Sequence, residues 1–379
     1  MAPSILSLVE RVIRTTSREH PADAVLREAL KSRSGFSPVE SAQASRAVFA
    51  YFRWCGWLDQ GQPISRQIQG ALQLADRFAK EPGRFSDADL VAHAVPAWLK
   101  DEMEITPAWA RALQSEPKLW LRARPGQGTA LAQKLGHCRP FGPGPLANAL
   151  VYQGHEDLFR TEEFRAGEFE LQDLSSQAVG LICAPKAGQT WWDACAGEGG
   201  KLLHLSDLME NKGLIWASDR AAWRLQRLKR RAARARIFNY RAAPWDGSPR
   251  LPTKTVFDGV LLDAPCSGIG TWHRNPHARW TTTPEDVKEL AELQKQLLIH
   301  AAPAVKPGGK LIYAACTLAR SETTAVVEAF ERQSPGFRPL AVRNPLQPEA
   351  VPAPRICFAP EQFGRNGMFV AAWVHARTY

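Results

Sequence analysis

From about residue 170 onward, short apolar runs alternate with helical stretches, and this rhythm limits the possible folds more than any other feature of the chain. The strands that we expect are Thr190–Asp193, Leu214–Ser218, Val260–Leu262 and Lys310–Ala314. Helices are expected over Lys201–Met209 and after Asp219. A third helix is expected to begin at Pro284, because proline suits a first helical position. This alternation predicts an α/β fold with a doubly wound, mostly parallel sheet, whose ligands bind at the carboxyl ends of the strands.

A glycine-rich loop follows the first of these strands. Its residues are Cys195, Ala196, Gly197, Glu198, Gly199, Gly200 and Lys201. Glycines let a backbone turn tightly and let a ligand approach without meeting Cβ atoms. Asp219 ends the second strand, where doubly wound folds hydrogen-bond a ribose diol. These features predict a nucleotide-type cofactor, and they do not distinguish a dinucleotide from S-adenosylmethionine. A tight turn between strand and helix, with no ligand, is the plainer alternative.

Two cysteines come directly after strands of the expected sheet. Cys266 ends the run Asp263-Ala-Pro-Cys, and Cys316 follows the strand after Gly308 and Gly309. Because carboxyl ends of parallel strands meet at one edge, we expect both thiols at the ligand edge of the sheet. A single cysteine is usually a small buried hydrophobe. We assign that role to the cysteines elsewhere in the chain, Cys55, Cys138, Cys183 and Cys357.

At these residues the chain resembles the Sun/Nop family of RNA cytosine-5 methyltransferases, and its RsmB-like members in particular. The resemblance covers roughly residues 170 to 375. It is carried by the segments Leu171–Gln177, Asp263–Gly268, Arg274–Trp280, Lys306–Thr317 and Asn366–Val370, and by Glu322.

The resemblance implies three domains. Residues 171–379 would form a Rossmann-like catalytic domain that binds S-adenosylmethionine. Residues 1–95, of which about the first 80 read as helices, would form an all-α antiterminator-like RNA-binding domain. Residues 96–170 would form a small α+β RNA-binding subdomain between them, in which the family's Leu-Arg-x-Asn element appears as Leu121–Arg124.

The resemblance also implies a reaction, namely methyl transfer to C5 of a cytosine in RNA, with ribosomal RNA of the small subunit favoured. It assigns the attack on C6 to Cys316, and it implies that Cys266 helps loss of the C5 proton and release of the product. A thiolate at C6 turns the ring into an enamine whose C5 can accept the methyl group. Asp263 could hydrogen-bond the base edge and stabilise developing charge. Because a free thiol has a pKa of roughly 8.5, Cys316 needs a cationic neighbour, for which Lys201 is a candidate.

Three positions depart from the family pattern. Glu198 stands where the cofactor loop usually has proline, and Ala315 stands where a threonine usually precedes the nucleophile. The acid after the third strand is not evident, and Asp246 is a candidate substitute for an adenine contact. The cofactor-binding residues that we expect are therefore Cys195 to Lys201, Asp219, Asp246 and Asp263. None of the departures removes a group that makes or breaks a bond, which favours an active enzyme.

The charge of the chain favours a polyanionic partner. Lys and Arg outnumber Asp and Glu by 48 to 38, which gives a net charge of +10. Eight basic residues and no acid lie between Arg220 and Arg236. They could bind phosphates, or they could be a solvated helix face. Trp272 and Trp280 could stack on bases near the cysteine loop.

Several classes of protein are disfavoured. No apolar run approaches the roughly 18 to 20 residues of a membrane span. The seven cysteines are scattered and contain no CxxC motif, so we expect reduced thiols and a cytoplasmic protein, which we also expect to be a monomer. Cys266, His273 and His277 lack a fourth ligand, so no metal is expected.

Four alternative functions remain open at this stage. One is a tRNA cytosine-5 methyltransferase. Another is a nicotinamide-dependent dehydrogenase, which leaves the paired cysteines unexplained. A DNA cytosine-5 methyltransferase would use Cys266 as the nucleophile. The last is a non-catalytic RNA-binding assembly factor that keeps the methyltransferase fold.

Overall fold

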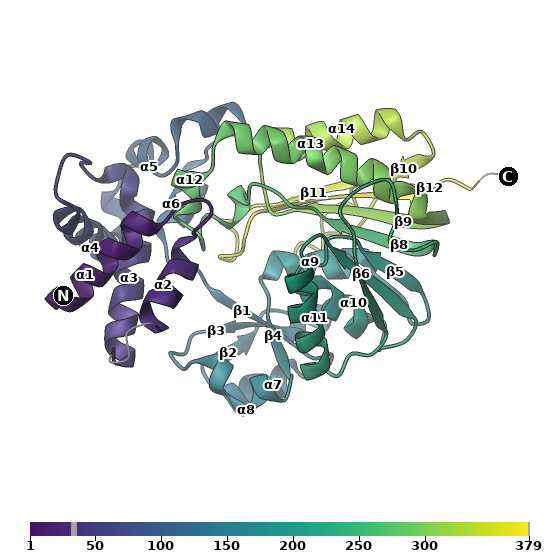
Figure 1. The fold of residues 1–379 in the computed structure, drawn as a ribbon, viewed down its shortest axis with the longest axis horizontal. Coiled ribbons are helices and arrows are strands. Elements are labelled where there is room, and N and C mark those ends of the chain that lie inside the picture. Colours follow the sequence, from purple (N-terminus) through teal and green to yellow (C-terminus); the bar gives the residue numbers. More distant parts are fainter. Residues whose placement is uncertain (32–35, 378–379) are drawn as a thin grey trace. The chain divides into compact units, whose positions relative to one another are not determined.

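A computed structural model describes residues 1–31 and 36–377 (Figure 1). The chain divides into two compact units. The helical unit comprises Met1–Pro117, Ser267–Val287 and Ala359–Gly364. The sheet unit comprises Lys118–Cys266, Lys288–Phe358 and the chain from Arg365 onward. Within the described ranges, no helix combines the length and apolarity that a membrane crossing requires.

The helical unit is built from amphipathic helices. They are α1 (Pro3–Thr15), α2 (Ala22–Lys31), α3 (Pro38–Trp54), α4 (Ile64–Lys80), α5 (Asp87–His93), α6 (Pro107–Gln114) and α12 (Ala278–Thr281), with short 3-10 helices η1 (Cys55–Trp57), η2 (Pro82–Arg84), η3 (Ala97–Asp101) and η6 (Ile269–Thr271). In α1 the buried residues Ile5, Leu8 and Val12 recur at helical spacing and form one apolar face. Ser37 and Glu40 cap α3 reciprocally, which satisfies backbone N–H groups at its first turn.

A buried arginine ties the segment after Cys266 to the amino-terminal helices. Arg279 is fully buried, and its guanidinium donates hydrogen bonds to the backbone carbonyls of Arg53, Ala94, Leu113 and Trp272. The first three carbonyls lie at the carboxyl ends of α3, α5 and α6, where helix dipoles carry partial negative charge. Hydrogen bonds to these helix carboxyl ends therefore replace the water that a buried guanidinium loses.

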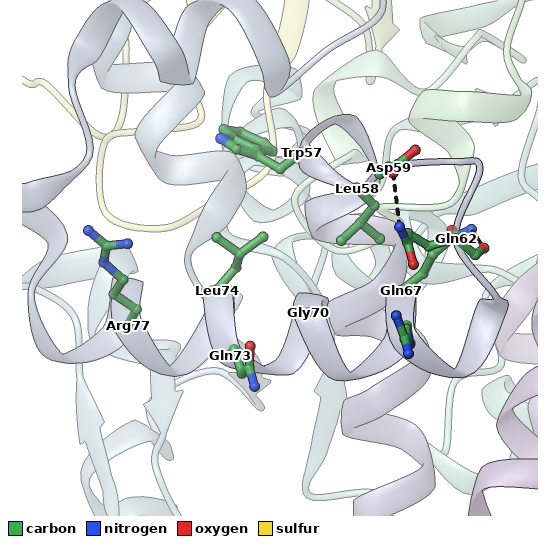
Figure 2. Close-up of a pocket in the computed structure, with 10 residues that line it drawn as sticks. Trp57, Leu58, Asp59, Gln62, Gln67, Gly70, Gln73, Leu74 and Arg77 are labelled. Carbon is green, nitrogen blue, oxygen red and sulfur yellow. Dashed lines mark hydrogen bonds between the residues drawn. The ribbon is translucent and has the colours of Figure 1, made fainter.

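A polar groove of about 520 Å³ runs along α4 of the helical unit (Figure 2). Its lining residues are Trp57, Leu58, Asp59, Gln62, Arg66, Gln67, Gly70, Gln73, Leu74 and Arg77. Asp59 is the acid among them, and its carboxylate already accepts hydrogen bonds from the Gly61 backbone and the Gln62 amide. The groove thus presents an indole, amides and guanidiniums. Its carboxylate, that of Asp59, is hydrogen-bonded to neighbouring residues of the same loop.

The sheet unit contains two sheets. The small sheet is antiparallel, with strand order β2-β3-β1-β4, and its elements are β1 (Leu119–Ala123), α7 (Gly128–Leu135), β2 (Cys138–Pro140), η4 (Gly144–Asn148), β3 (Ala149–Tyr152), η5 (Leu158–Arg160), α8 (Glu162–Arg165) and β4 (Phe169–Leu171).

The large sheet has the order β10-β12-β9-β8-β5-β6-β7, and β11 pairs with β12. Its strands are β5 (Thr190–Asp193), β6 (Leu214–Asp219), β7 (Tyr240–Pro244), β8 (Phe257–Asp263), β9 (Val305–Ala315), β10 (Phe337–Pro339), β11 (Arg355–Phe358) and β12 (Met368–His375). The helices are α9 (Leu174–Cys183), α10 (Gly200–Leu208), α11 (Ala222–Arg234), α13 (Pro284–Ala301), whose first turn belongs to the helical unit, and α14 (Thr324–Gln333), with η7 (Ala302–Ala304) and η8 (Arg320–Glu322). The strands from β9 to β7 are parallel, whereas β12 is antiparallel to β9.

Helices cover both faces of the large sheet, because side chains of a strand alternate between its faces. Trp191, Leu261 and Ile312 pack with residues of α9, α10 and α11 in one core. The neighbouring residues Trp192 and Leu262 pack with α13 and α14 in the other (Figure 1). The predicted doubly wound fold is confirmed by this arrangement.

The predicted strands agree closely with the observed ones, with one difference. The strand expected at Lys310–Ala314 begins earlier, at Val305, so Lys306–Gly309 lie inside β9. Phe257 of β8 pairs with Val305, whereas Gly259 pairs with Lys310, so the intervening residues bulge out of the register. Gly308 has a φ of 82°, which a residue with a side chain rarely adopts.

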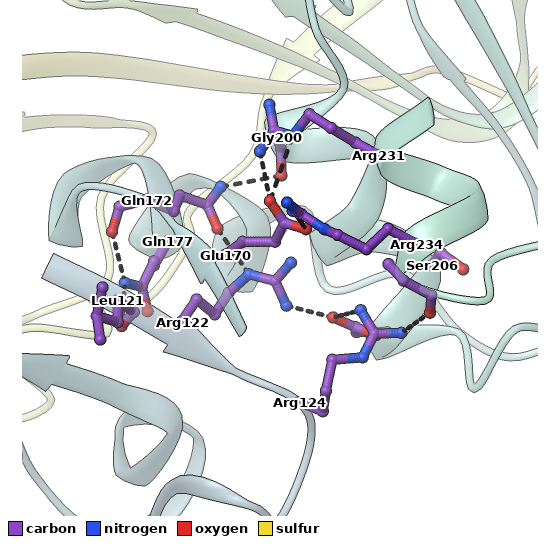
Figure 3. Close-up of polar contacts among 12 residues, drawn as sticks. Leu121, Arg122, Arg124, Glu170, Gln172, Gln177, Gly200, Ser206, Arg231 and Arg234 are labelled. Carbon is purple, nitrogen blue, oxygen red and sulfur yellow. Dashed lines mark hydrogen bonds and ion pairs between the residues drawn. The ribbon is translucent and has the colours of Figure 1, made fainter. Parts of the chain in front are cut away.

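Two buried carboxylates join the small sheet to helices of the large sheet (Figure 3). Glu170 of β4 accepts from Arg231 at 2.8 Å and from Arg234 at 2.5 Å, both on α11. Asp207 of α10 pairs with Arg122 and Arg124. Arg122 lies in β1, and Arg124 directly follows that strand. Each carboxylate therefore bridges two elements that are far apart in the sequence.

The pairs around Glu170 yield a test of stability. Burial alone raises the pKa of Glu170, but Arg231 and Arg234 outweigh it and hold that pKa below the ordinary value of 4.5. We predict that Glu170→Gln lowers the unfolding free energy at pH 7 by about 1.5–3 kcal/mol, because it removes charge-assisted hydrogen bonds from two partly buried guanidiniums. A lowered folded-state pKa means that this stabilisation is present above the unfolded pKa and is lost as the pH falls through the folded one, so the variant and the wild type should converge in acid. Denaturant unfolding measures both effects. As a control, Glu168→Gln removes the half-exposed pair with Lys134 and should cost less than about 1 kcal/mol; equal losses in the two variants would contradict the account.

Candidate active site

The glycine loop between β5 and α10 needs its glycines for two different reasons. Gly197 and Gly199 have φ values of 54° and 88°, which favour glycine. A Cβ at Gly199 would also lie 2.7 Å from Leu228 Cγ, so this glycine lets α11 pack against the loop. A Cβ at Gly197 or Gly200 would meet nothing within 4 Å. The space over these two glycines is therefore open to a ligand.

Asp219, at the end of β6, holds the glycine loop. One carboxylate oxygen accepts from the Gly197 backbone N–H at 3.0 Å, and the other accepts from Ala221 N–H at 2.8 Å. Arg224 Nη1 lies 3.8 Å from the same carboxylate. A carboxylate has about four acceptor positions, so two remain for a ligand's hydroxyls. Asp219 thus holds the glycine loop and keeps acceptor positions that could bind the hydroxyls of a ribose diol.

Lys201 and Asp263 form an ion pair below the glycine loop. Lys201 Nζ lies 2.5 Å from Asp263 Oδ2, and the lysine side chain is almost fully buried. Burial by itself lowers the pKa of Lys201, but the charges of Asp263, Cys316 and Asp193 raise it above its ordinary value overall. Lys201 therefore stays cationic, and its charge interacts with that of the Cys316 thiol.

The two thiols lie side by side. Cys266 follows β8 and Cys316 follows β9, and the parallel pairing of Asp263 with Ala314 brings both strand ends to one edge. Their sulfur atoms are 3.2 Å apart, and both residues are partly exposed. Two groups at this spacing can reach the same face of one small planar substrate.

The loop, the acids and the thiols line one cavity of about 430 Å³. Of the residues expected from the sequence, it gathers Cys195, Ala196, Gly197, Glu198, Gly200, Lys201, Asp219, Asp246, Asp263, Cys266 and Cys316. Gly199 is not in its wall, because it forms the amino-terminal cap of α10. Residues that were not among the expected site residues complete the wall, and they include Ser176, Arg220, Arg224, Trp245, Leu293 and Leu297. Leu293 and Leu297 lie four residues apart on α13, a spacing that indicates a shared helix face without telling which cavity it meets.

Two of the departures from the family pattern have local partners. Glu198 Oε1 accepts from Arg227 Nη1 at 2.7 Å, so its charge beside the cavity is neutralised. Asp246 is in the cavity wall, and its Oδ1 accepts from the Ser248 backbone N–H at 3.0 Å, which lowers the pKa of Asp246. Glu198 is therefore paired with a cation, whereas Asp246 is held by a backbone hydrogen bond.

The helical unit contains the tryptophans and histidines of the cysteine-loop region. The prediction that Trp272 stacks on bases is wrong, because it is fully buried and packs edge-on against Trp98. Trp280 is half-buried and donates to the Phe52 carbonyl at 2.7 Å. His273 Nε2 contacts the Ser115 carbonyl. Over residues 1–31 and 36–377, no group of three or more His, Cys, Asp or Glu side chains is arranged to hold a metal ion.

The basic residues of the arginine-rich segment fall into three classes. Arg224 and Arg227 are exposed and pair with Asp219 and Glu198 beside the cavity. Arg231 and Arg234 are bound to Glu170, so they are structural. Other members are exposed and make no ion pair in the part of the chain that the structure describes, and they are Arg220, Lys229, Arg230 and Arg236. Trp223 is 53% exposed on the same helix, with the guanidiniums of Arg224 and Arg227 over its ring.

A comparison with protein families matches residues 180–374, just over half of the chain, to the family described as 16S rRNA methyltransferase RsmB/F. The chain belongs to this family of S-adenosylmethionine-dependent RNA cytosine-5 methyltransferases. Its cofactor is therefore S-adenosylmethionine, and the open space over the glycines, Asp219 and the apolar wall of Leu293 and Leu297 fit such a molecule.

Curated relatives agree with the family match. The chain is 31% identical to a probable ribosomal RNA small subunit methyltransferase B of Synechocystis, over 81% of this chain and 74% of that protein. It is 36% identical to the Bacillus subtilis protein of the same description, over 60% of this chain and 53% of that protein. A 28S rRNA (cytosine-C(5))-methyltransferase of Mus musculus is 33% identical over 50% of this chain and 24% of that protein. The chain thus spans only about half of some of the relatives that it matches.

Solved structures share the fold. PH0851 superposes with a TM-score of 0.79 and 22% identity, over 98% of this chain and 99% of that one. NSun6 from Pyrococcus horikoshii, solved with SFG, has a TM-score of 0.62 and 18% identity, over 72% of this chain and 94% of that one. The predicted α/β methyltransferase fold, with a helical region and a small sheet, is confirmed.

The double role of Asp219 can be separated by ligand chemistry. We predict that Asp219→Ala weakens S-adenosylmethionine binding by about 1–3 kcal/mol, because the diol is left without its acceptors and the Gly197 N–H without its carboxylate. Calorimetry with a 2′-deoxy analogue isolates the diol. The wild type should bind the analogue more weakly than S-adenosylmethionine, and Asp219→Ala should bind both ligands equally. Undiminished discrimination by the variant would show that Asp219 acts on the loop alone.

Proposed function

We propose that this protein methylates C5 of a cytosine in the RNA of the small ribosomal subunit, with Cys316 as the nucleophile. One observation carries the proposal. The thiols of Cys266 and Cys316 lie 3.2 Å apart in the wall of the cavity that also contains the glycine loop and Asp219. A dehydrogenase would have no use for two thiols there, so the dinucleotide alternative loses its support.

The first step needs a sulfur nucleophile beside a positive charge. The Cys316 sulfur adds to C6 of the cytosine, the C5=C6 double bond opens, and its electron pair makes C5 nucleophilic. Asp263, held by Lys201, accepts a hydrogen bond from the exocyclic amine and fixes the base edge. When bound, S-adenosylmethionine supplies an electrophilic methyl carbon. The residues expected to hold it are those of the loop from Cys195 to Lys201, with Asp219, Asp246 and Asp263.

The second step restores the aromatic ring. C5 then carries both a hydrogen and the new methyl group. Removal of that proton returns its electron pair to the C5=C6 bond and expels the Cys316 thiolate. Cys266, 3.2 Å from the same sulfur, is positioned to assist proton loss and release. This assignment gives each thiol a separate step.

The choice of RNA rests on the relatives. The bacterial proteins are described as small-subunit methyltransferases, and the mouse protein as acting on 28S rRNA. We place the RNA-binding domain at residues 1–95, the small RNA-binding subdomain at 96–170 and the catalytic domain at 171–379, acting as a monomer in the cytoplasm. The indole, amides and guanidiniums of the α4 groove are groups that bind bases and phosphates, which supports RNA binding by the helical unit. The alternatives are a tRNA substrate and a non-catalytic assembly factor.

The outer face of α11 supports RNA binding by the sheet unit. Arg220 and Arg224 line the cavity, and exposed basic residues continue along the helix from there. Exposed cations without carboxylate partners attract phosphates, and an exposed indole such as Trp223 stacks on bases. We propose that RNA runs along this face as it enters the cavity.

The division of labour between the thiols is the most direct test of the reaction. Cys316→Ala should abolish methyl transfer while cofactor binding persists, because no C6 adduct forms. Cys266→Ala should still add and accept the methyl group, and then stall. The stalled enzyme should remain joined to small-subunit ribosomal RNA as a denaturant-resistant band in a gel, in an S-adenosylmethionine-dependent way.

Each control separates one alternative. The double variant should give no band, and deproteinised tRNA should give none with Cys266→Ala. A band with tRNA alone would transfer the substrate to that class. A band in Cys316→Ala would reverse the two roles. Absence of both methyl transfer and adduct on every RNA would favour the assembly factor.

Salt dependence tests the α11 surface. We predict that the triple variant Lys229→Ala, Arg230→Ala and Arg236→Ala flattens the slope of log affinity against log salt, by about 0.7 for each phosphate of single-stranded RNA that the variant no longer neutralises. Filter binding at several salt concentrations measures the slope. The matched control Arg230→Lys with Arg236→Lys keeps the charges and should keep the wild-type slope. An unchanged slope in the alanine variant would show that these basic residues only face solvent and do not bind phosphates.

A further inference from the structure

A fully buried glutamine lies behind the two thiols. Gln294 of α13 is 0% exposed, next to Leu293, which lines the cavity. Its amide nitrogen donates to the Pro265 carbonyl at 2.9 Å and to Glu322 Oε1 at 2.9 Å. Pro265 is the residue directly before Cys266. One side chain therefore contacts the backbone of the first cysteine loop and an acid that belongs to the second.

Glu322 continues this connection to the second cysteine. It is also 0% exposed, and its Oε2 accepts from Thr317 Oγ1 at 2.8 Å. Thr317 directly follows Cys316, and its hydroxyl oxygen also accepts from the Ala319 backbone N–H at 3.3 Å. The turn after Cys316 is therefore held from within by its own side chains.

Tyr313 joins the same network from β9. Its hydroxyl lies 2.9 Å from Gln294 Oε1 and 2.7 Å from the Glu322 carbonyl. A hydroxyl has one hydrogen, so Tyr313 donates to one of these two oxygens at a time. The two acceptors of the Gln294 amide nitrogen, the Pro265 carbonyl and Glu322 Oε1, orient the amide. Burial raises the pKa of Tyr313 well above its ordinary value, with further contributions from Cys266, Glu322 and Cys316, so its hydroxyl keeps its proton as a donor.

We propose that Gln294, Glu322 and Thr317 are positioning residues that set the distance between the two thiols. The inference rests on the proposed roles of Cys266 and Cys316. It names the residues that hold the two cysteine loops at the spacing that those roles require. The register of β8 against β9 runs as far as Asp263 and Ala314, and each cysteine lies beyond it. The bonds from Pro265 through Gln294 and Glu322 to Thr317 link the two loops past that point.

A purely structural role would make this network a set of polar groups that satisfy one another inside the core. Its placement argues for more than that. Each end of the chain of bonds stops at a residue adjacent to a cysteine, and buried, fully satisfied networks are rigid. A small displacement of reacting groups costs rate even when the fold is intact, on the order of 100-fold for about 1 Å.

The test uses a probe of thiol spacing that requires no RNA and no catalysis. Phenylarsine oxide binds tightly when two thiols can reach one arsenic atom. The wild type should bind it about 100-fold more tightly than Cys266→Ala or Cys316→Ala, since two linked contacts add avidity. The difference from those two variants removes the contribution of other cysteines, including Cys195.

Gln294→Met keeps the size of the side chain and removes its hydrogen bonds, and Thr317→Val removes the hydroxyl. We expect each to lower phenylarsine oxide affinity about 10-fold and methyl transfer by about 10- to 100-fold. S-adenosylmethionine affinity should stay close to wild type, and the melting temperature should fall modestly because buried polar groups lose a partner. Thr317→Ser, which restores the hydroxyl, should recover both properties. A change in kcat with little change in KM for RNA is expected.

Two outcomes would overturn the proposal. One is wild-type arsenical affinity in both Gln294→Met and Thr317→Val. The other is a parallel loss of cofactor affinity and folding that Thr317→Ser does not repair, which is the signature of core packing. Failure of the proposed function gives a different result, namely tight arsenical binding by the wild type without methyl transfer to any RNA.

Discussion

The parallel pairing of β8 with β9 is the constraint on which the site depends. Register between these strands puts Asp263 opposite Ala314, so the loops that follow begin at the same edge. Both strands are buried on both faces, and slippage by one residue would exchange the residues that face α9 with those that face α13. The core thereby fixes the strand ends from which the loops of Cys266 and Cys316 begin.

Buried charges organise the rest of the sheet unit through ion pairing. Lys201 has Asp263 as its partner, and Glu170 has Arg231 and Arg234, which offsets the cost of taking these charges out of water. The pair at the cavity positions a cation beside the thiols, and the pairs around Glu170 attach the small sheet to α11. The same helix then presents its other basic residues outward. One helix therefore supplies both an internal brace and an external charged surface.

The sequence could predict the parts of the molecule that depend on local patterns. The strand ends, the glycine loop and the placement of both thiols at one edge follow from spacing along the chain, because a parallel sheet gathers its strand ends at one edge. Contacts between distant segments could not be read in that way. The bond from Gln294 to Glu322 joins residues 28 positions apart, and Trp272 was expected at the surface although it is buried. A tryptophan beside an arginine has the same local appearance in a core and on an RNA-binding face.

The central claim is that Cys316 forms the bond to the base and that Cys266 acts afterwards. The most direct measurement is peptide mass spectrometry of the wild-type enzyme trapped on RNA that contains 5-fluorocytidine, in which fluorine replaces the hydrogen that must leave C5. The account predicts a methylated fluoropyrimidine nucleotide attached to the peptide that contains Cys316, and an unmodified Cys266 peptide. Attachment to Cys266 would contradict it.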